Sequence, residues 1–233
     1  MNRKVRIGID VGGTFTDAVV IDNRTYEVIA ERKIPTTHKE GVARGVVRIA
    51  SALMKENNIA PEDVVFIAHG TTQATNALLE GDVAKVGVIG MATGADARRT
   101  KGETTVEDIE LAPGKYLKSV SAFLDSKTLT DETIEGAIRE LLEKKAQVLV
   151  ASEAFGVDDP ANELRVQECA RKKGLYCTGG HEISQLYGLK MRTRTAVINA
   201  SLIPKMVETA DMTEQAVRDT KIQSSLMIMR CDG

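Results

Sequence analysis

The stretch RIGIDVGGTFTDAVVID, Arg6 to Asp22, decides how the chain begins. Two apolar runs flank a polar segment that contains two aspartates, Asp10 and Asp17, two glycines and two threonines, and this pattern predicts two strands joined by a tight turn. Because Gly12 and Gly13 lack a Cβ atom, the backbone can bend sharply there and approach a ligand closely. The first strand ends on Asp10, so the turn combines close backbone approach with a carboxylate.

Outside this stretch, strand and helix patterns alternate along the chain. A turn signal at residues 22–25 and an alternating run at 26–34 extend the opening pair to an antiparallel meander of three strands. A helix follows, then further strands and helices, and Thr130 is a candidate helix cap. We expect residues 91–119 to be irregular and residues 191–220 to be helical, with a break near Pro204. The alternation predicts a layered α/β fold with a mixed sheet flanked by helices.

The glycine turn is a candidate phosphate-binding loop. Successive backbone N–H groups in such a turn form a concavity for an anion, and Thr14 and Thr16 add hydroxyl donors. A carboxylate beside a phosphate is repelled unless a cation lies between them, so Asp10 implies Mg²⁺. The competing interpretation is a hairpin whose hydroxyls satisfy its own backbone. Asp17 has two open roles, contacting a substrate or holding the hairpin.

A second candidate site lies in HGTTQATNALLEG, residues 69–81. His69 follows an apolar strand pattern, and Thr71 and Thr72 precede a short helix whose N-terminus favours an anion. Asn76 lies one turn further on, with an amide that can donate and accept hydrogen bonds. The alternative is that a threonine only caps the helix and that His69 is a core residue.

A third motif, TGGHEIS at residues 178–184, follows another strand pattern and contains His181. It either lines the same cleft as the first two motifs or forms an ordinary turn between a strand and a helix.

The amino-acid composition argues against several classes of binding partner. The chain has 31 basic and 33 acidic residues, a net charge of −2, and only 3% aromatic residues, so we expect no nucleic-acid partner. Three cysteines form no metal-binding pattern, and their odd number fits reduced thiols in the cytoplasm. No apolar run reaches the length of a membrane span, so we expect no membrane association.

The motifs resemble those of a known family. DVGGTFTD, residues 10–17, is similar to the first phosphate loop of the actin-like ATPase superfamily, whose domains have a ribonuclease H-like fold. Its ending TFTD, together with HGTTQATNALLEG, RTRTAVINASLIP (residues 192–204) and LMIMRCDG (residues 226–233), resembles the hydantoinase/oxoprolinase family. That family includes ATP-dependent hydantoinases and oxoprolinases and the ATP-using subunits of ketone carboxylases.

The resemblance implies ATP and Mg²⁺ as cofactors and a role for each motif residue. Asp10, His69 and Thr71 become the expected catalytic residues, with Asp10 also the metal ligand. Asp17 and Asn76 are expected to contact a cyclic amide or ketone substrate. The nucleotide is expected to contact the remaining motif residues, which are Gly12, Gly13, Thr14, Phe15, Thr16 and Thr72.

The resemblance also suggests how the chain is organised. Superfamily members bind ATP between two similar domains, yet the chain contains one DVGGT motif. We therefore expect residues 1–190 to form an N-terminal domain and residues 191–233 to link it to a truncated second domain. The predicted function is an ATP-dependent hydrolase subunit in a homo-oligomer or with a partner subunit. The alternatives are a subunit of a ketone carboxylase and a non-catalytic, nucleotide-responsive or assembly subunit.

Overall fold

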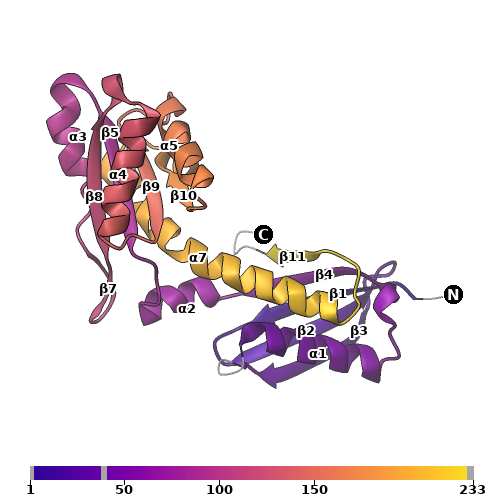
Figure 1. The fold of residues 1–233 in the computed structure, drawn as a ribbon. Helices are drawn as coiled ribbons and strands as arrows, with labels where there is room; N and C mark the ends of the chain where they lie inside the picture. The colour runs from indigo at the N-terminus through magenta and orange to yellow at the C-terminus, as the bar shows by residue number, and fades with distance from the viewer. Residues whose placement is uncertain (1–2, 38–40, 230–233) are drawn as a thin grey trace. The chain divides into compact units, whose positions relative to one another are not determined.

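The computed structural model describes residues 3–37 and 41–229. The chain divides into two compact units, which are described separately: unit 1 is Met1–Asn76 with Met206–Gly233, and unit 2 is Ala77–Lys205 (Figure 1). A division at residue 190 would fall inside the long helix α7 (Leu189–Asp219), and the 1–190 and 191–233 domains stay a prediction. The end of the LMIMRCDG motif, residues 230–233, lies outside the described ranges.

Unit 1 is built on a five-stranded mixed sheet in the order β11-β4-β1-β2-β3. The predicted meander is confirmed, because β1 pairs antiparallel with β2, and β2 with β3. β4 pairs parallel with β1, and β11 pairs parallel with β4. The strands are β1 (Val5–Val11), β2 (Phe15–Asp22), β3 (Val28–Pro35), β4 (Val64–Thr71) and β11 (Leu226–Met229).

The two faces of this sheet differ in character. Alternate residues of β1 point to opposite faces, and the set Val5, Ile7, Ile9 and Val11 is buried in the core of unit 1. Helix α1 (Val42–Glu56) contributes Val46, Ile49 and Leu53 to the same core. The other face carries Arg6, Gly8 and Asp10. The end of β1 therefore presents Asp10 on the face opposite the core.

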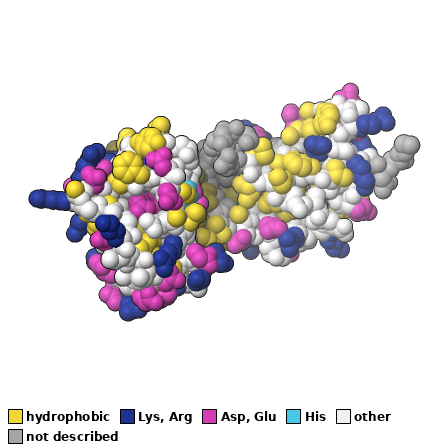
Figure 2. All heavy atoms as spheres, turned by 90° about the horizontal axis from the view of Figure 1, so that it is seen from above, with side chains coloured by type: hydrophobic (Ala, Val, Ile, Leu, Met, Phe, Trp, Pro, Cys, Tyr) yellow, Lys and Arg dark blue, Asp and Glu magenta, His cyan; other side chains and the backbone are white. Residues whose placement is uncertain are grey.

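Unit 2 contains a four-stranded parallel sheet in the order β10-β9-β5-β8. Every residue of β5 and β9 is buried, as expected for parallel strands covered on both faces. Helices α3, α4, α5 and α6 and a two-stranded hairpin belong to this unit, and α7 begins in it. The bounds are β5 (Val86–Ala92), α3 (Ala97–Thr104), β6 (Ile109–Ala112), β7 (Lys115–Leu117), β8 (Ser119–Asp125), α4 (Asp131–Glu143), β9 (Val148–Glu153), α5 (Ala161–Lys172), β10 (Cys177–Gly179) and α6 (Gly180–Ile183). On the face seen in Figure 2, basic and acidic side chains are intermixed over both units.

The predicted helix cap at Thr130 is confirmed. Thr130 caps α4, accepting a hydrogen bond from the backbone N–H of Thr133 and completing a reciprocal capping box. The expectation of irregular structure over residues 91–119 is wrong. That segment contains α3 and the β6–β7 hairpin, and α3 has so few apolar residues that Thr100 and Thr104 form its buried face.

Helix α7 also corrects a prediction. It runs unbroken for 31 residues with Pro204 inside it, although proline removes one helical hydrogen bond. Apolar burial on both sides of Pro204 offsets this loss: Ala196, Val197 and Ala200 pack in the core of unit 2, and Val217 packs in the core of unit 1. Within the described ranges, no helix combines the length and apolar character needed to cross a bilayer.

Candidate phosphate-binding site

The turn between β1 and β2 is braced by Thr36, which directly follows β3. Its hydroxyl donates to the carbonyl oxygen of Gly12 at 2.9 Å, and its N–H donates to the carbonyl of Thr14 at 2.9 Å. Gly12 N–H also donates across the turn to the carbonyl of Phe15 at 3.0 Å. Thr36 therefore fixes the shape of the loop, while Gly13 and Thr14 are exposed.

The start of helix α2 (Gln73–Glu80) lies beside this turn. Thr72 N–H donates to the carbonyl of Val11 at 3.3 Å, which ties the β4–α2 connection to the end of β1. A Cβ atom placed on Gly13 would lie 3.3 Å from Nδ2 of Asn76. The structure thus brings the two N-terminal motifs together within unit 1, as their predicted common site requires. Thr71, the last residue of β4, pairs with Val11 in the sheet.

Asp10 lies exposed at the end of β1, between Asp17 of β2 and Gly70 of β4. A Cβ atom on Gly70 would be 3.3 Å from Oδ1 of Asp10, so the missing side chain leaves room beside the carboxylate. No hydrogen bond or ion pair of Asp10 is found among residues 3–37 and 41–229. An exposed carboxylate with free oxygens and open space beside it fits a Mg²⁺ ligand, either directly or through water.

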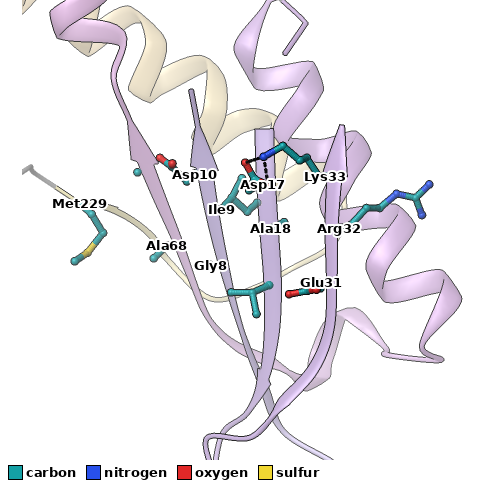
Figure 3. Close-up of a pocket in the computed structure, with 12 residues that line it drawn as sticks. Gly8, Ile9, Asp10, Asp17, Ala18, Glu31, Arg32, Lys33, Ala68 and Met229 are labelled. Atoms are coloured by element: carbon teal, nitrogen blue, oxygen red, sulfur yellow. Dashed lines mark hydrogen bonds and ion pairs between the residues drawn. The ribbon is translucent and has the colours of Figure 1, made fainter. Parts of the chain in front are cut away.

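Asp10 also borders a pocket of about 650 Å³ on the open face of the sheet. Figure 3 shows Gly8 and Ala68 on the strands of its floor, Met229 at one side, and Asp17 joined to Lys33 at the other. The Lys33 ammonium lies 3.1 Å from the Asp17 carboxylate, and both side chains are about half exposed. The same ammonium lies 5.0 Å from the centre of the exposed Phe15 ring. Asp17 therefore combines an ion pair within the hairpin with a place on the pocket wall.

Thr14 is exposed in the turn, whereas Thr16 is buried. Thr16 is 1% exposed, and its hydroxyl lies 3.2 Å from that of Thr36. The pair Thr16–Thr36 supports the turn from its buried side. This placement differs from the expected contact between the Thr16 hydroxyl and a nucleotide, because the buried Thr16 hydroxyl has Thr36 as its partner.

His69 is buried in β4, two residues before the end of the strand, and pairs with Ile9 of β1. Alternation therefore places it on the core face, opposite the Asp10 side chain. It is 1% exposed, and neither ring nitrogen has a hydrogen-bond partner in the part of the chain that the structure describes. Burial lowers the pKa of His69, although the negative charge of Asp10 acts to raise it. A buried, neutral imidazole is the form favoured here.

Sequence reasoning missed three contributors to this site. Thr36 braces the turn, Gly70 makes room beside Asp10, and Lys33 pairs with Asp17. Their signals were weak: Thr36 belongs to a polar segment after β3, and Gly70 lies unremarked inside the HGTT motif. Only the strand registers place Gly70 beside Asp10, through the pairing of β1 with β4, and Lys33 beside Asp17, through the pairing of β2 with β3. Which of the motif residues contact a nucleotide stays a prediction.

Known proteins resemble this chain in sequence and in architecture. Caprolactamase subunit alpha of Pseudomonas jessenii is 28% identical over 88% of this chain and 32% of its own length. The acetophenone carboxylase gamma subunit of Aromatoleum aromaticum is 26% identical over 97% of this chain and 35% of its own. The chain thus spans about a third of the length of these curated relatives.

The fold comparison agrees with the sequence comparison. The crystal structure of the ATP-dependent caprolactamase from Pseudomonas jessenii matches 96% of this chain and 35% of that chain, with 25% identity and a TM-score of 0.68. The predicted actin-like ATPase fold, with its antiparallel N-terminal meander, is confirmed. The model of the hydantoinase/oxoprolinase N-terminal region matches residues 6–174, and the hydantoinase/oxoprolinase model matches residues 192–233. Because these two matches span nearly the whole sequence, the chain belongs to the hydantoinase/oxoprolinase family.

Proposed function

We propose that the chain supplies one wall of the phosphate site in an ATP-dependent enzyme of the hydantoinase type. The observation that carries this proposal is the braced glycine turn beside Asp10, closed on its other side by the start of α2. The exposed turn at Gly13 and Thr14 lets an anion approach the backbone closely, and the N-terminus of α2 adds partial positive charge.

The residues would share the work as follows. Gly12, Gly13 and Thr14 hold the phosphates by close backbone approach, and Thr16 and Thr36 keep the turn in shape. Asp10 holds Mg²⁺, which offsets negative charge on the phosphates. Catalysis by this wall is positioning and electrostatic stabilisation, as is general for phosphoryl transfer.

The substrate class follows from the same chemistry. An amide carbonyl resists attack by water, and transfer of a phosphoryl group from ATP to its oxygen makes the carbonyl carbon more electrophilic. Water can then add to this carbon, the ring C–N bond breaks, and hydrolysis of the acyl phosphate that remains releases phosphate. We infer a cyclic amide, a lactam or hydantoin, as the substrate that the whole enzyme opens. The relative named caprolactamase supports this choice. The relative named acetophenone carboxylase supports the second candidate, activation of a ketone oxygen for carboxylation.

Both relatives are named as subunits, alpha in one case and gamma in the other. We therefore propose that the enzyme works with a partner subunit or as a homo-oligomer. A purely nucleotide-responsive or assembly role would leave the nucleotide site intact but without turnover.

Thermal unfolding of the full-length protein with and without Mg-ATP tests the nucleotide site. We expect Mg-ATP to raise the melting temperature, because a ligand that binds only the folded state stabilises it. Asp10→Asn should remove the shift. Asp211→Asn, which changes an exposed carboxylate on α7 of the same unit, should keep it. An unchanged melting temperature in the wild-type protein would refute the proposed ATP site.

ATP turnover with a substrate panel then separates the functions. Hydantoins and 5-oxoproline test ring opening, and small ketones with bicarbonate test carboxylation. Nucleotide binding without turnover on any of them would support the non-catalytic role.

A further inference from the structure

The carboxyl ends of the parallel strands in unit 2 gather polar side chains that the phosphate site does not use. The chain passes from β8 to β9 across β5, so the direction of winding changes in this sheet. Open α/β sheets bind ligands outside the carboxyl ends of their strands at such a change. Ser152 and Glu153 end β9, and His181 follows β10.

Glu163 and His181 form an oriented pair at this edge. Glu163, on α5, is fully buried; its Oε1 accepts from Glu153 N–H at 2.8 Å and its Oε2 from His181 N–H at 2.9 Å. The same Oε2 lies 2.6 Å from Nδ1 of the His181 ring. Because the carboxylate is already an acceptor on both oxygens, Nδ1 carries the proton and donates it. In the neutral ring, the other nitrogen, Nε2, presents a lone pair.

The Nε2 atom is open to a ligand. The His181 side chain keeps 16% exposure, and Nε2 is not among the buried polar atoms without a partner. No hydrogen bond of Nε2 occurs within the described ranges. A buried carboxylate on one ring nitrogen and an accessible lone pair on the other fix the tautomer and orientation of a hydrogen-bond acceptor.

Two glycines make room for this pair. A Cβ atom on Gly179 would lie 2.6 Å from Cε1 of His181, and one on Gly156 would lie 2.6 Å from Oε1 of Glu163. Real Cβ atoms do not approach so closely, so any other residue at either position would displace the ring or the carboxylate. Gly156 lies in the turn after β9 and Gly179 ends β10, and both lack side chains where the pair needs space.

The surroundings disfavour an anionic ligand. Arg192 donates from its two terminal nitrogens to the carbonyls of Leu186 and Glu153, so these donors are not available to a ligand. The other charged groups bonded into this network are carboxylates, including Glu153 and Glu163. Burial raises the pKa of the Glu153 carboxyl, while hydrogen bonds from Ser126 and Asn162 lower it. A neutral ligand that offers a hydrogen to Nε2 fits this environment better than a phosphate or carboxylate.

Apolar side chains are exposed on the loops that follow these strands. Phe155 is 64% exposed and adopts a positive φ of 62°, a strained conformation for a bulky residue that is common at functional sites. Leu186 and Tyr187 are 74% and 66% exposed, and Tyr187 donates to Asp158 at 2.8 Å, which links the two loops. Figure 2 shows hydrophobic side chains exposed beside acidic ones on this unit.

We propose that the carboxyl edge of the unit 2 sheet is a second small-molecule site, the His181 site. Its ligand is a neutral molecule with an N–H donor next to an apolar part, such as a secondary amide. The N–H donates to Nε2 of His181, and the apolar part packs against the loops of Phe155 and Leu186. The site needs no nucleotide, so its test is independent of the ATP proposal.

Nuclear magnetic resonance of the histidine rings tests the proposal directly. The sequence has three histidines, and comparison with His181→Gln assigns the ring of interest. Long-range proton–nitrogen spectra should show His181 with its proton on Nδ1. Adding 2-pyrrolidinone should shift the Nε2 resonance in a saturable way, with a dissociation constant on the order of millimolar. N-methyl-2-pyrrolidinone, which lacks the N–H, should leave it in place. A proton on Nε2, or equal responses to both amides, would overturn the proposal.

Variants separate the site from a merely structural network. Glu163→Gln should relax the tautomer preference and weaken the response to 2-pyrrolidinone several-fold. Arg171→Gln, an exposed change on the same helix, should leave both unchanged. If Glu163→Gln fails to fold, the wild-type comparison of the two pyrrolidinones still decides the question. No response of the wild-type Nε2 at saturating amide would refute the site.

Discussion

The side-chain amide of Asn76 lies against the backbone of Gly13: a Cβ atom on Gly13 would be only 3.3 Å from Nδ2 of Asn76. The contact joins residues 63 positions apart in the sequence and connects the first glycine turn to the start of α2. The contact couples the two motifs, so a substitution in one motif should change the effect on stability of a substitution in the other.

Gly13→Ala should therefore destabilise the turn, and Asn76→Ala should relieve part of the effect. Overpacking costs about 1–3 kcal/mol where neighbours cannot move, and the amide end of Asn76 can move to some extent, so we expect the low end of that range. Urea unfolding of both single variants and the double variant gives the coupling. Strictly additive effects would contradict the contact.

Thr36→Val should loosen the same turn from the opposite side. The substitution removes the hydroxyl that bonds Gly12 and Thr16, and a lost hydrogen bond costs about 0.5–1.5 kcal/mol. Thr25→Val, which removes a hydroxyl bonded to the exposed Glu27, is the matched control and should change little. We expect Thr36→Val to weaken Mg-ATP binding by the full-length protein as well as stability. Equal stability of the two variants would show that Thr36 does not brace the loop.

The sequence indicates the meander and the position of the glycine turn because both depend on local rules. Alternating apolar residues and glycines without Cβ atoms act over a few residues. The sheet face on which a side chain lies, and the residues that it contacts, cannot be predicted in this way, because they depend on the register of strand pairing. That His69 points into the core while Asp10 points away follows only from Ile9 pairing with His69 and Asp10 with Gly70.

In unit 2, helix α3 and the partner of His181 are further features that local sequence rules do not predict. Helix α3 has almost no apolar periodicity, since its buried positions are Thr100 and Thr104, so sequence patterns indicated a loop. The TGGHEIS motif is visible in the sequence, yet Glu163, the partner of its histidine, lies 18 residues away on α5 and is fully buried. A buried glutamate in a helix of mostly polar residues gives no signal in a single sequence.

Gly179→Ala should destabilise unit 2 by roughly 1–3 kcal/mol, because its Cβ atom would overlap the His181 ring. Gly136→Ala is the matched control: it lies in α4 with no atom within 4 Å of the added Cβ. That change should stabilise the protein by about 0.5–1 kcal/mol, the helix propensity difference between the two residues. Thermal unfolding distinguishes the two, and a stabilising Gly179→Ala would place the His181 ring elsewhere.

The burial of His69 predicts that the free energy of unfolding depends on pH, and it fixes the sign of that dependence. Burial lowers the pKa of His69 in the folded state below its ordinary value of 6.5. Well above pH 6.5 the ring is neutral in both states, and its effect on stability is constant. As the pH falls from 6.5 toward the lowered pKa of the folded state, the unfolded chain binds the proton more readily, so the free energy of unfolding decreases.

His69→Leu should remove this dependence, because leucine fills the core position without binding a proton. The measurement is urea unfolding of both proteins between about pH 8 and 5.5, a window chosen around the ordinary histidine pKa. We expect the wild-type protein to lose stability relative to His69→Leu on the acidic side of 6.5, while the difference stays flat above it. Since both proteins carry the same carboxylates, acid effects from those groups cancel in the comparison. A constant difference across the whole range would mean that His69 accepts a proton in the folded protein, and that the imidazole is less buried than its place in β4 indicates.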